Sequence, residues 1–226
     1  MDGWKHRSHF SIDSENVRPF SPAVPNRERA YPPRPVEIAD VLSAQSKIGE
    51  PSVGAWGALI MSFFGAVFVA LTLYWQWHLS GITLALPFLG FVLIGLAASY
   101  VIRAPGKGIK PSPKEERAIM WSSIGEGIGL FLAANIVVNL HRPDLLLPSM
   151  ALVVGLHFLP IAFAAGFRPF YVLGTALIFA AVMGFIVEAP TGGTVAGLMA
   201  AGALWLASGI AVRRDWLAKR STVATV

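Results

Sequence analysis

The chain has 226 residues, of which 54% are hydrophobic and only 14% are charged, and its formal net charge is +5. Soluble domains have roughly 45–50% apolar and about 25% charged residues, so this composition indicates a membrane protein. The absence of cysteine excludes disulfides, thiolate chemistry, Cys-ligated zinc and iron–sulfur clusters. No nucleic-acid-binding motif is present either, and we expect neither a cofactor nor a nucleic-acid partner.

The first 50 residues differ in composition from the rest of the chain. Prolines crowd residues 1–35 and remove helix and sheet hydrogen bonds, so this segment is predicted to be a disordered tail. In residues 36–50, apolar side chains recur at helical spacing between Pro35 and Pro51. This segment is predicted to be a short amphipathic helix at the membrane interface, with a solvated helix as the alternative.

Residues 51–213 contain six apolar runs, each near the length of about 20 residues that a membrane-spanning helix needs. Helices are favoured over strands because the runs are continuous, and because a backbone facing lipid must satisfy its own hydrogen bonds. The predicted fold is therefore an all-α bundle of six transmembrane helices, followed by a C-terminal tail over residues 214–226. The predicted spans are 55–75, 83–102, 119–140, 145–167, 170–188 and 193–212.

The basic residues are distributed unequally between the two sets of loops. Of the 18 Lys and Arg residues, all except Arg142 lie in the N-terminal tail, after the even-numbered spans or at the C-terminus. Loops rich in Lys and Arg stay in the cytoplasm. We therefore predict that the N- and C-termini are both cytoplasmic, and that the lipid bilayer is the first partner of this chain.

The third predicted span contains a carboxylate, Glu126, inside an apolar run. A charge at such a depth is costly in hydrocarbon and needs a partner or a function. At ~1.5 Å per residue, Glu126 lies roughly 10 Å from the cytoplasmic face, and His157 in the fourth span lies roughly 18 Å from the outer face. In a hydrocarbon core of about 30 Å these depths nearly coincide. Because a short turn joins the two spans, we predict a Glu126–His157 pair, with either a proton- or solute-handling role or a structural one.

Three further positions in these spans accompany the predicted pair. Pro160 cannot donate a hydrogen bond to the carbonyl of Leu156, so the fourth span is expected to bend near His157. Asn135 and Asn139 add polar character to the third span. At about 100° per residue, Asn135 points away from Glu126, so the two asparagines are predicted to form a second polar face and remain candidate solute ligands.

Small residues recur at helical spacing in the third and sixth spans. Gly125 and Gly129 lie four residues apart, as do Gly193 and Gly197. Such faces let helices approach closely in lipid. We predict that these glycines are packing surfaces, and a homo-oligomer or another membrane protein is a candidate partner.

Two short segments carry a family resemblance. The run Gly155-Leu-His-Phe-Leu-Pro160, followed by Pro169-Phe-Tyr-Val-Leu-Gly174, resembles a group of small bacterial six-helix membrane proteins of unknown function. Their fourth span carries Gly-x-His-Phe-x-Pro, and a fifth span with Tyr and Gly follows it. The resemblance covers residues 50–212 and not the proline-rich tail. It implies a six-helix protein of the bacterial inner membrane and singles out His157 and Pro160, but it carries over no mechanism.

Enzyme signatures are poorly matched. There is no His-Glu-x-x-His metal motif, and Ser208-Gly209 lacks the context of an intramembrane serine protease. We therefore favour a small transporter or permease-like protein in which Glu126 and His157 are protonatable and Pro160 breaks the helix. The alternatives are a non-catalytic scaffold or accessory subunit of a membrane complex and, third, a membrane enzyme acting on lipid.

Overall fold

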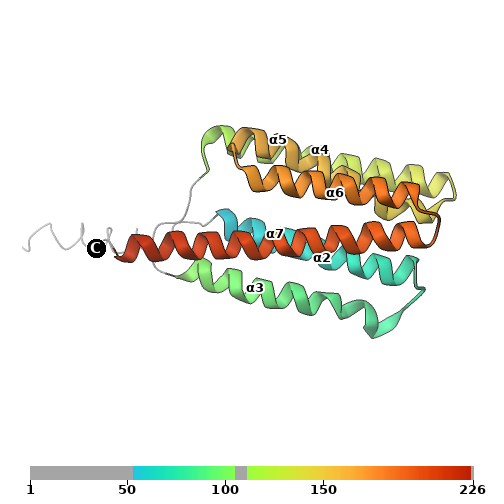
Figure 1. Cartoon of the computed structure of the whole chain (residues 1–226), viewed down its shortest axis with the longest axis horizontal. Helices are drawn as coiled ribbons and strands as arrows, with labels where there is room; N and C mark the ends of the chain where they lie inside the picture. The colour runs from blue at the N-terminus through green and yellow to red at the C-terminus, as the bar shows by residue number, and fades with distance from the viewer. Residues whose placement is uncertain (1–52, 105–110, 225–226) are drawn as a thin grey trace, which may run out of the picture. The chain divides into compact units, whose positions relative to one another are not determined.

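The computed structural model describes residues 53–104 and 111–224, and all of them belong to one compact unit. Figure 1 shows this part of the chain as a set of long helices. Two 3-10 turns, η1 (Gly81–Ala85) and η2 (Pro143–Leu145), lie just before α3 and α5. The α-helices are α2 (Val53–Trp75), α3 (Pro87–Arg103), α4 (Pro113–Asn139), α5 (Leu146–Ala165), α6 (Arg168–Ile186) and α7 (Thr191–Ala224).

Each of these six helices is long and apolar enough to cross a membrane, when η1 is counted with α3 and η2 with α5. The prediction of an all-helical domain with six such helices is therefore confirmed for the described residues. The sixth helix continues well beyond the predicted span 193–212, since α7 extends to Ala224 and includes much of the segment expected as a tail. The predicted disordered tail (1–35) and interfacial helix (36–50) lie outside the described residues.

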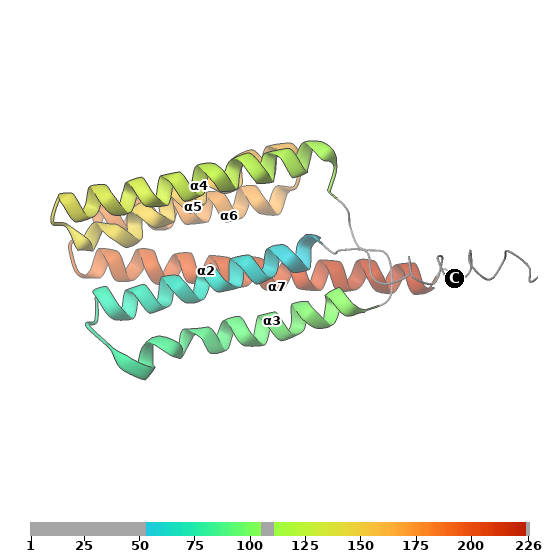
Figure 2. The same cartoon turned by 180° about the vertical axis from the view of Figure 1, so that it is seen from behind.

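The helices pack side by side in the order α3, α2, α7, α6, α5, α4, and α5 also contacts α7. Both views of the chain show α3 at one edge of this array and α4 at the other (Figures 1 and 2). The two edge helices are the least enclosed: 11% of the most apolar stretch is buried for η1–α3 and 6% for α4, against 44% for η2–α5. Large apolar faces of α3 and α4 are consequently uncovered within the described chain.

The core lies between α2, α5, α6 and α7. Its largest fully buried apolar side chains are Phe68, Leu147, Leu177 and Leu204, one from each of these helices. Alanines fill the remaining contacts, which lets the helix backbones approach closely. The four inner helices thus form the packed core, and the edge helices α3 and α4 pack against it.

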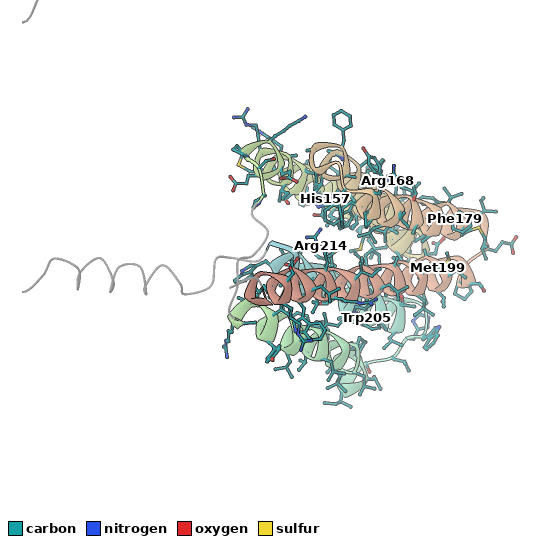
Figure 3. All side chains as sticks on the ribbon, turned by 60° about the vertical axis from the view of Figure 1, so that its left-hand side comes forward. His157, Arg168, Phe179, Met199, Trp205 and Arg214 are labelled. Atoms are coloured by element: carbon teal, nitrogen blue, oxygen red, sulfur yellow. The ribbon has the colours of Figure 1, made fainter. Side chains whose placement is uncertain are left out.

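Trp205 of α7 contacts both α2 and α3. Its indole Nε1 donates a hydrogen bond to the carbonyl of Ser62 in α2 at 3.1 Å. Gly65 of α2 and Gly90 of α3 provide the space for the indole ring, because a Cβ at either position would press against it. Figure 3 shows Trp205 on the side of α7 that carries α2 and α3.

Most basic side chains of the described chain gather at one end of the array, which we call the basic end. Here α3, α5 and α7 finish and α2, α4 and α6 begin. The left-handed Gly166, with a φ of 59°, ends α5 at this end and allows the sharp turn into α6. Arg142 lies at the opposite end, between α4 and α5. The basic end contains Arg103, Lys114, Arg117, Arg168, Arg213, Arg214, Lys219 and Arg220.

Candidate functional site

Glu126 is carried by α4, whose start is strongly specified by the sequence. Ser112 caps the helix: its hydroxyl accepts from the Glu115 N–H, and the Glu115 carboxylate accepts from the Ser112 N–H. Pro113 follows at the first helical position, where its missing N–H costs nothing. The cap fixes where α4 begins, and the packing of α4 on α5 turns Glu126 toward α5, where its side chain is 13% exposed.

His157 of α5 faces Glu126, as the sequence predicted. The His157 Nδ1 lies 3.5 Å from the Glu126 Oε2, and the His157 side chain is 10% exposed. Nδ1 is buried and makes no hydrogen bond, so the two groups are close neighbours without a well-aligned hydrogen bond between them. The imidazole also makes an edge-to-face contact with Phe158, with ring centroids 5.1 Å apart. The pair is therefore held in position while one of its nitrogens stays unsatisfied.

Pro160 and Ser122 determine the backbone around this pair. The ring of Pro160 removes the hydrogen-bond donor for the Leu156 carbonyl and disturbs the ladder of α5 beside His157. The Ser122 hydroxyl donates to the adjacent His157 carbonyl at 2.6 Å. This hydrogen bond joins α4 to α5 one residue away from the Leu156 carbonyl, which is the one that Pro160 leaves without a donor. Helix α5 continues across Pro160 to Ala165.

An open groove of about 720 Å³ runs between α4 and α5 and contains the pair. Lys114 and Arg117 lie at its mouth at the basic end, and Glu126 and His157 lie deeper. Its walls are mainly apolar and are formed by side chains such as Leu156. A volume of this size is within the range of small-molecule sites. Remaining lining residues are Ala118, Trp121, Ser122, Gly125, Gly129, Val153, Pro160, Phe163 and Ala164.

The structure does not bring Asn135 and Asn139 to this groove. Both side chains are exposed and neither lines the cavity. The Asn135 amide donates to the Phe131 carbonyl of its own helix at 2.7 Å. The prediction that they lie apart from Glu126 fits this arrangement, and their role as solute ligands stays a prediction.

The four predicted packing glycines differ in their surroundings. An added Cβ on Gly129 would press on Val153 of α5, one on Gly193 would overlap Gln76, and one on Gly197 would overlap Thr72. These three sites are close helix contacts. A Cβ on Gly125 would meet nothing within 4 Å in the described chain, so its packing role stays a prediction. Gly125 lines the groove, and its missing side chain leaves the cavity wider there.

Sequence reasoning missed a second polar cluster, at the basic end. Asp215 of α7 is 1% exposed, and its carboxylate accepts a hydrogen bond from the Ala55 N–H in the first turn of α2 at 2.9 Å. A Cβ on Gly54 would overlap this carboxylate, so the close approach requires glycine. Arg214 contacts Asp215 at 3.4 Å and lies over the Phe167 ring at 4.6 Å. The carboxylate therefore caps a helix from another part of the chain.

Lys219 lies one turn further along α7 and is 1% exposed. It caps the C-terminal end of α3, as Asp215 caps the N-terminal end of α2. Its ammonium group donates to the carbonyls of Val101, Ile102 and Ala104 at 2.7, 3.0 and 2.9 Å. A cation suits a helix C-terminus and an anion a helix N-terminus. The sequence signal for this cluster is Asp215, a single acid within the basic run Arg213–Arg220. Membrane orientation accounts for the basic residues of this run but not for the acid.

Two further findings concern metal binding and similarity to known proteins. In the described residues, no three His, Asp or Glu side chains converge in a way that would hold a metal ion. Comparison with protein-family models, with curated proteins and with solved structures finds no significant match. The resemblance to small bacterial six-helix proteins therefore stays a prediction.

Proposed function

We propose that this chain is a multi-pass protein of the bacterial inner membrane and acts as a small transporter or permease-like protein. Its Glu126–His157 pair would exchange protons as a solute or proton passes through the groove between α4 and α5. The observation that carries the proposal is the largely enclosed pair itself: two ionisable side chains from different helices, 3.5 Å apart, in apolar helices. Ionisable groups at such positions often mark ion paths and proton relays.

The pair has the properties that proton exchange requires. Glu126 can hold a negative charge beside a protonated His157, or both can be neutral after the proton moves to the carboxylate. The His157 Nδ1 makes no hydrogen bond and lies 3.5 Å from the Glu126 carboxylate, so it is placed to exchange a proton with that group. Both side chains line an open groove, so a ligand can reach them without unfolding a helix.

The proposed topology has the N-terminus and the basic end in the cytoplasm. It is supported by the distribution of Lys and Arg in the described helices, where Arg142 alone lies at the opposite end. The positive-inside rule relates such an asymmetry to orientation in the membrane. Glu126 would then be reached first from the cytoplasmic side, through the mouth of the groove.

Proton flux in vesicles tests the proposal. The purified full chain is reconstituted with a pH-sensitive dye inside the vesicles and is given a pH gradient. We expect the parent protein to carry flux that Glu126→Gln and His157→Ala abolish, because neither variant can exchange a proton within the pair. Glu188→Gln removes an acid outside the groove and is expected to leave the flux unchanged.

A second candidate is a scaffold or accessory subunit of a membrane complex. It is favoured by the uncovered faces of the edge helices α3 and α4, which another membrane protein could cover. In that case the Glu126–His157 pair would only hold α4 against α5. Absence of flux in the parent, together with a large loss of thermal stability in Glu126→Gln and His157→Ala, would reject transport and favour this candidate.

A further inference from the structure

The groove between α4 and α5 opens toward the outside of the array and not into its core. Three of its lining side chains are exposed apolar residues: Trp121 is 63% exposed, Leu156 50% and Phe163 73%. In Figure 3, His157 lies in the half of the array formed by α4, α5 and α6. In the proposed membrane setting, this groove is lined by apolar surface at hydrocarbon depth and faces lipid. An acyl chain is the molecule available to fill it.

The mouth of the groove carries a concentrated positive charge. Lys114 and Arg117 lie three residues apart on one face of α4. The Lys114 ammonium group is 5.7 Å from the centre of the Phe163 ring on the opposite wall, so it stands over the groove. The acids between the two cations do not line the groove, and Glu115 is occupied in the helix cap. An anionic group at the mouth would meet two cations and no carboxylate.

The length of the groove matches one leaflet of a bilayer. From Lys114 to Gly129 an α-helix rises roughly 22 Å. The hydrocarbon core is about 30 Å thick, so one leaflet takes about half of that, and the remaining length reaches the headgroup level. Trp121 near the mouth is typical of a membrane interface. Charge at one end and apolar walls along the rest correspond to a lipid headgroup and its chain.

We infer that this groove binds one anionic phospholipid, with the phosphate at Lys114 and Arg117 and one acyl chain along α5 past Phe163 and Pro160 toward Glu126. The inference rests on the proposed function for the idea that this groove handles a ligand, and it names the class of that ligand. Basic side chains near a membrane surface favour anionic over zwitterionic lipid by about fivefold each.

Fluorescence quenching by brominated lipids tests this inference. The full chain is reconstituted in phosphatidylcholine vesicles that contain a minor fraction of brominated phosphatidylglycerol or, in parallel, brominated phosphatidylcholine. The signal of Trp121 is obtained as the difference between the parent and Trp121→Phe, since the chain has 7 tryptophans. We expect the anionic quencher to be preferred by several-fold in the parent, and this preference to disappear in Lys114→Gln/Arg117→Gln.

The matched control removes the same charge at the same end of the array but away from the groove. Arg103 and Arg213 are exposed and do not line it, so Arg103→Gln/Arg213→Gln should retain the preference. An equal loss in this control, or no preference in the parent, would overturn the inference. Glu126→Gln should keep the preference while losing proton flux. Lipid preference without flux in the parent would reject only the proposed function, and flux without lipid preference would reject only this inference.

Discussion

At the scale of single residues, Ser122 connects the two helices of the candidate site. Its hydroxyl donates to the His157 carbonyl across the α4–α5 contact, close to the place where Pro160 interrupts the ladder. The serine therefore contributes both to helix association and to the position of the imidazole. Glu126 and His157 lie 3.5 Å apart without a hydrogen bond, so their contact constrains the geometry less than the Ser122 hydrogen bond does.

Ser122→Ala should loosen this site. We expect the variant to lose about 0.5–1.5 kcal/mol of stability, because the hydrogen bond disappears and the His157 carbonyl loses a partner. Thermal unfolding of the purified protein in detergent measures the loss. Ser123→Ala is the matched control, since Ser123 is exposed on the same helix and should change stability by less than about 0.5 kcal/mol. Equal effects of the two substitutions would show that the hydrogen bond contributes nothing specific.

At the scale of elements, the extension of α7 beyond the predicted span explains how the edge helix α3 is held. Helix ends leave main-chain groups without partners inside the helix. Lys219 supplies donors for three such carbonyls at the end of α3, and Asp215 accepts from an N–H at the start of α2. One helix thus caps two others, and its last turns are part of the fold of the basic end.

Lys219→Met tests this role at nearly constant side-chain length. We expect a loss of about 2–4 kcal/mol, because three carbonyls lose a charged donor in a buried position. Hydrogen exchange should become faster in the last turn of α3, around Val101, and remain slow at the buried centre of α5. Arg213→Met is the control, because Arg213 is exposed on the same helix. Unchanged exchange at the end of α3 would contradict the capping role.

The sequence could predict depth but not rotation about the helix axes. The length of the apolar runs gave the number of helices, and counting residues from their ends put Glu126 and His157 at one level. The side each helix presents depends on packing with partners far along the chain, such as α2 with α7. This is why the sequence could not show that Gly125 lines the groove or that Gly197 lies against Thr72. The caps of Asp215 and Lys219 depend on the same long-range packing.

At the scale of the whole domain, the six helices form an array with two uncovered edges. The inner helices α2, α5, α6 and α7 share the core, whereas α3 and α4 each contact few neighbours. The candidate groove lies at one of these edges, between α4 and its single extensive neighbour α5. Movement of α4 would therefore change the groove while leaving the core intact, and this suits a site that takes up and releases a ligand.

The proposed orientation follows from the charge difference between the two ends, and the chain offers a direct way to test it. Because the protein has no native cysteine, single substitutions give unique labelling sites. Ser80, before η1 at the end opposite the basic end, and Ser221, near the end of α7, are both exposed. In intact cells we expect a membrane-impermeant maleimide to label Ser80→Cys but not Ser221→Cys, since the basic end should face the cytoplasm. Opening the membrane should make Ser221→Cys reactive and so serves as its control. The reverse pattern would invert the topology, and the mouth of the groove would then face the outside, with Lys114 and Arg117 at the outer leaflet.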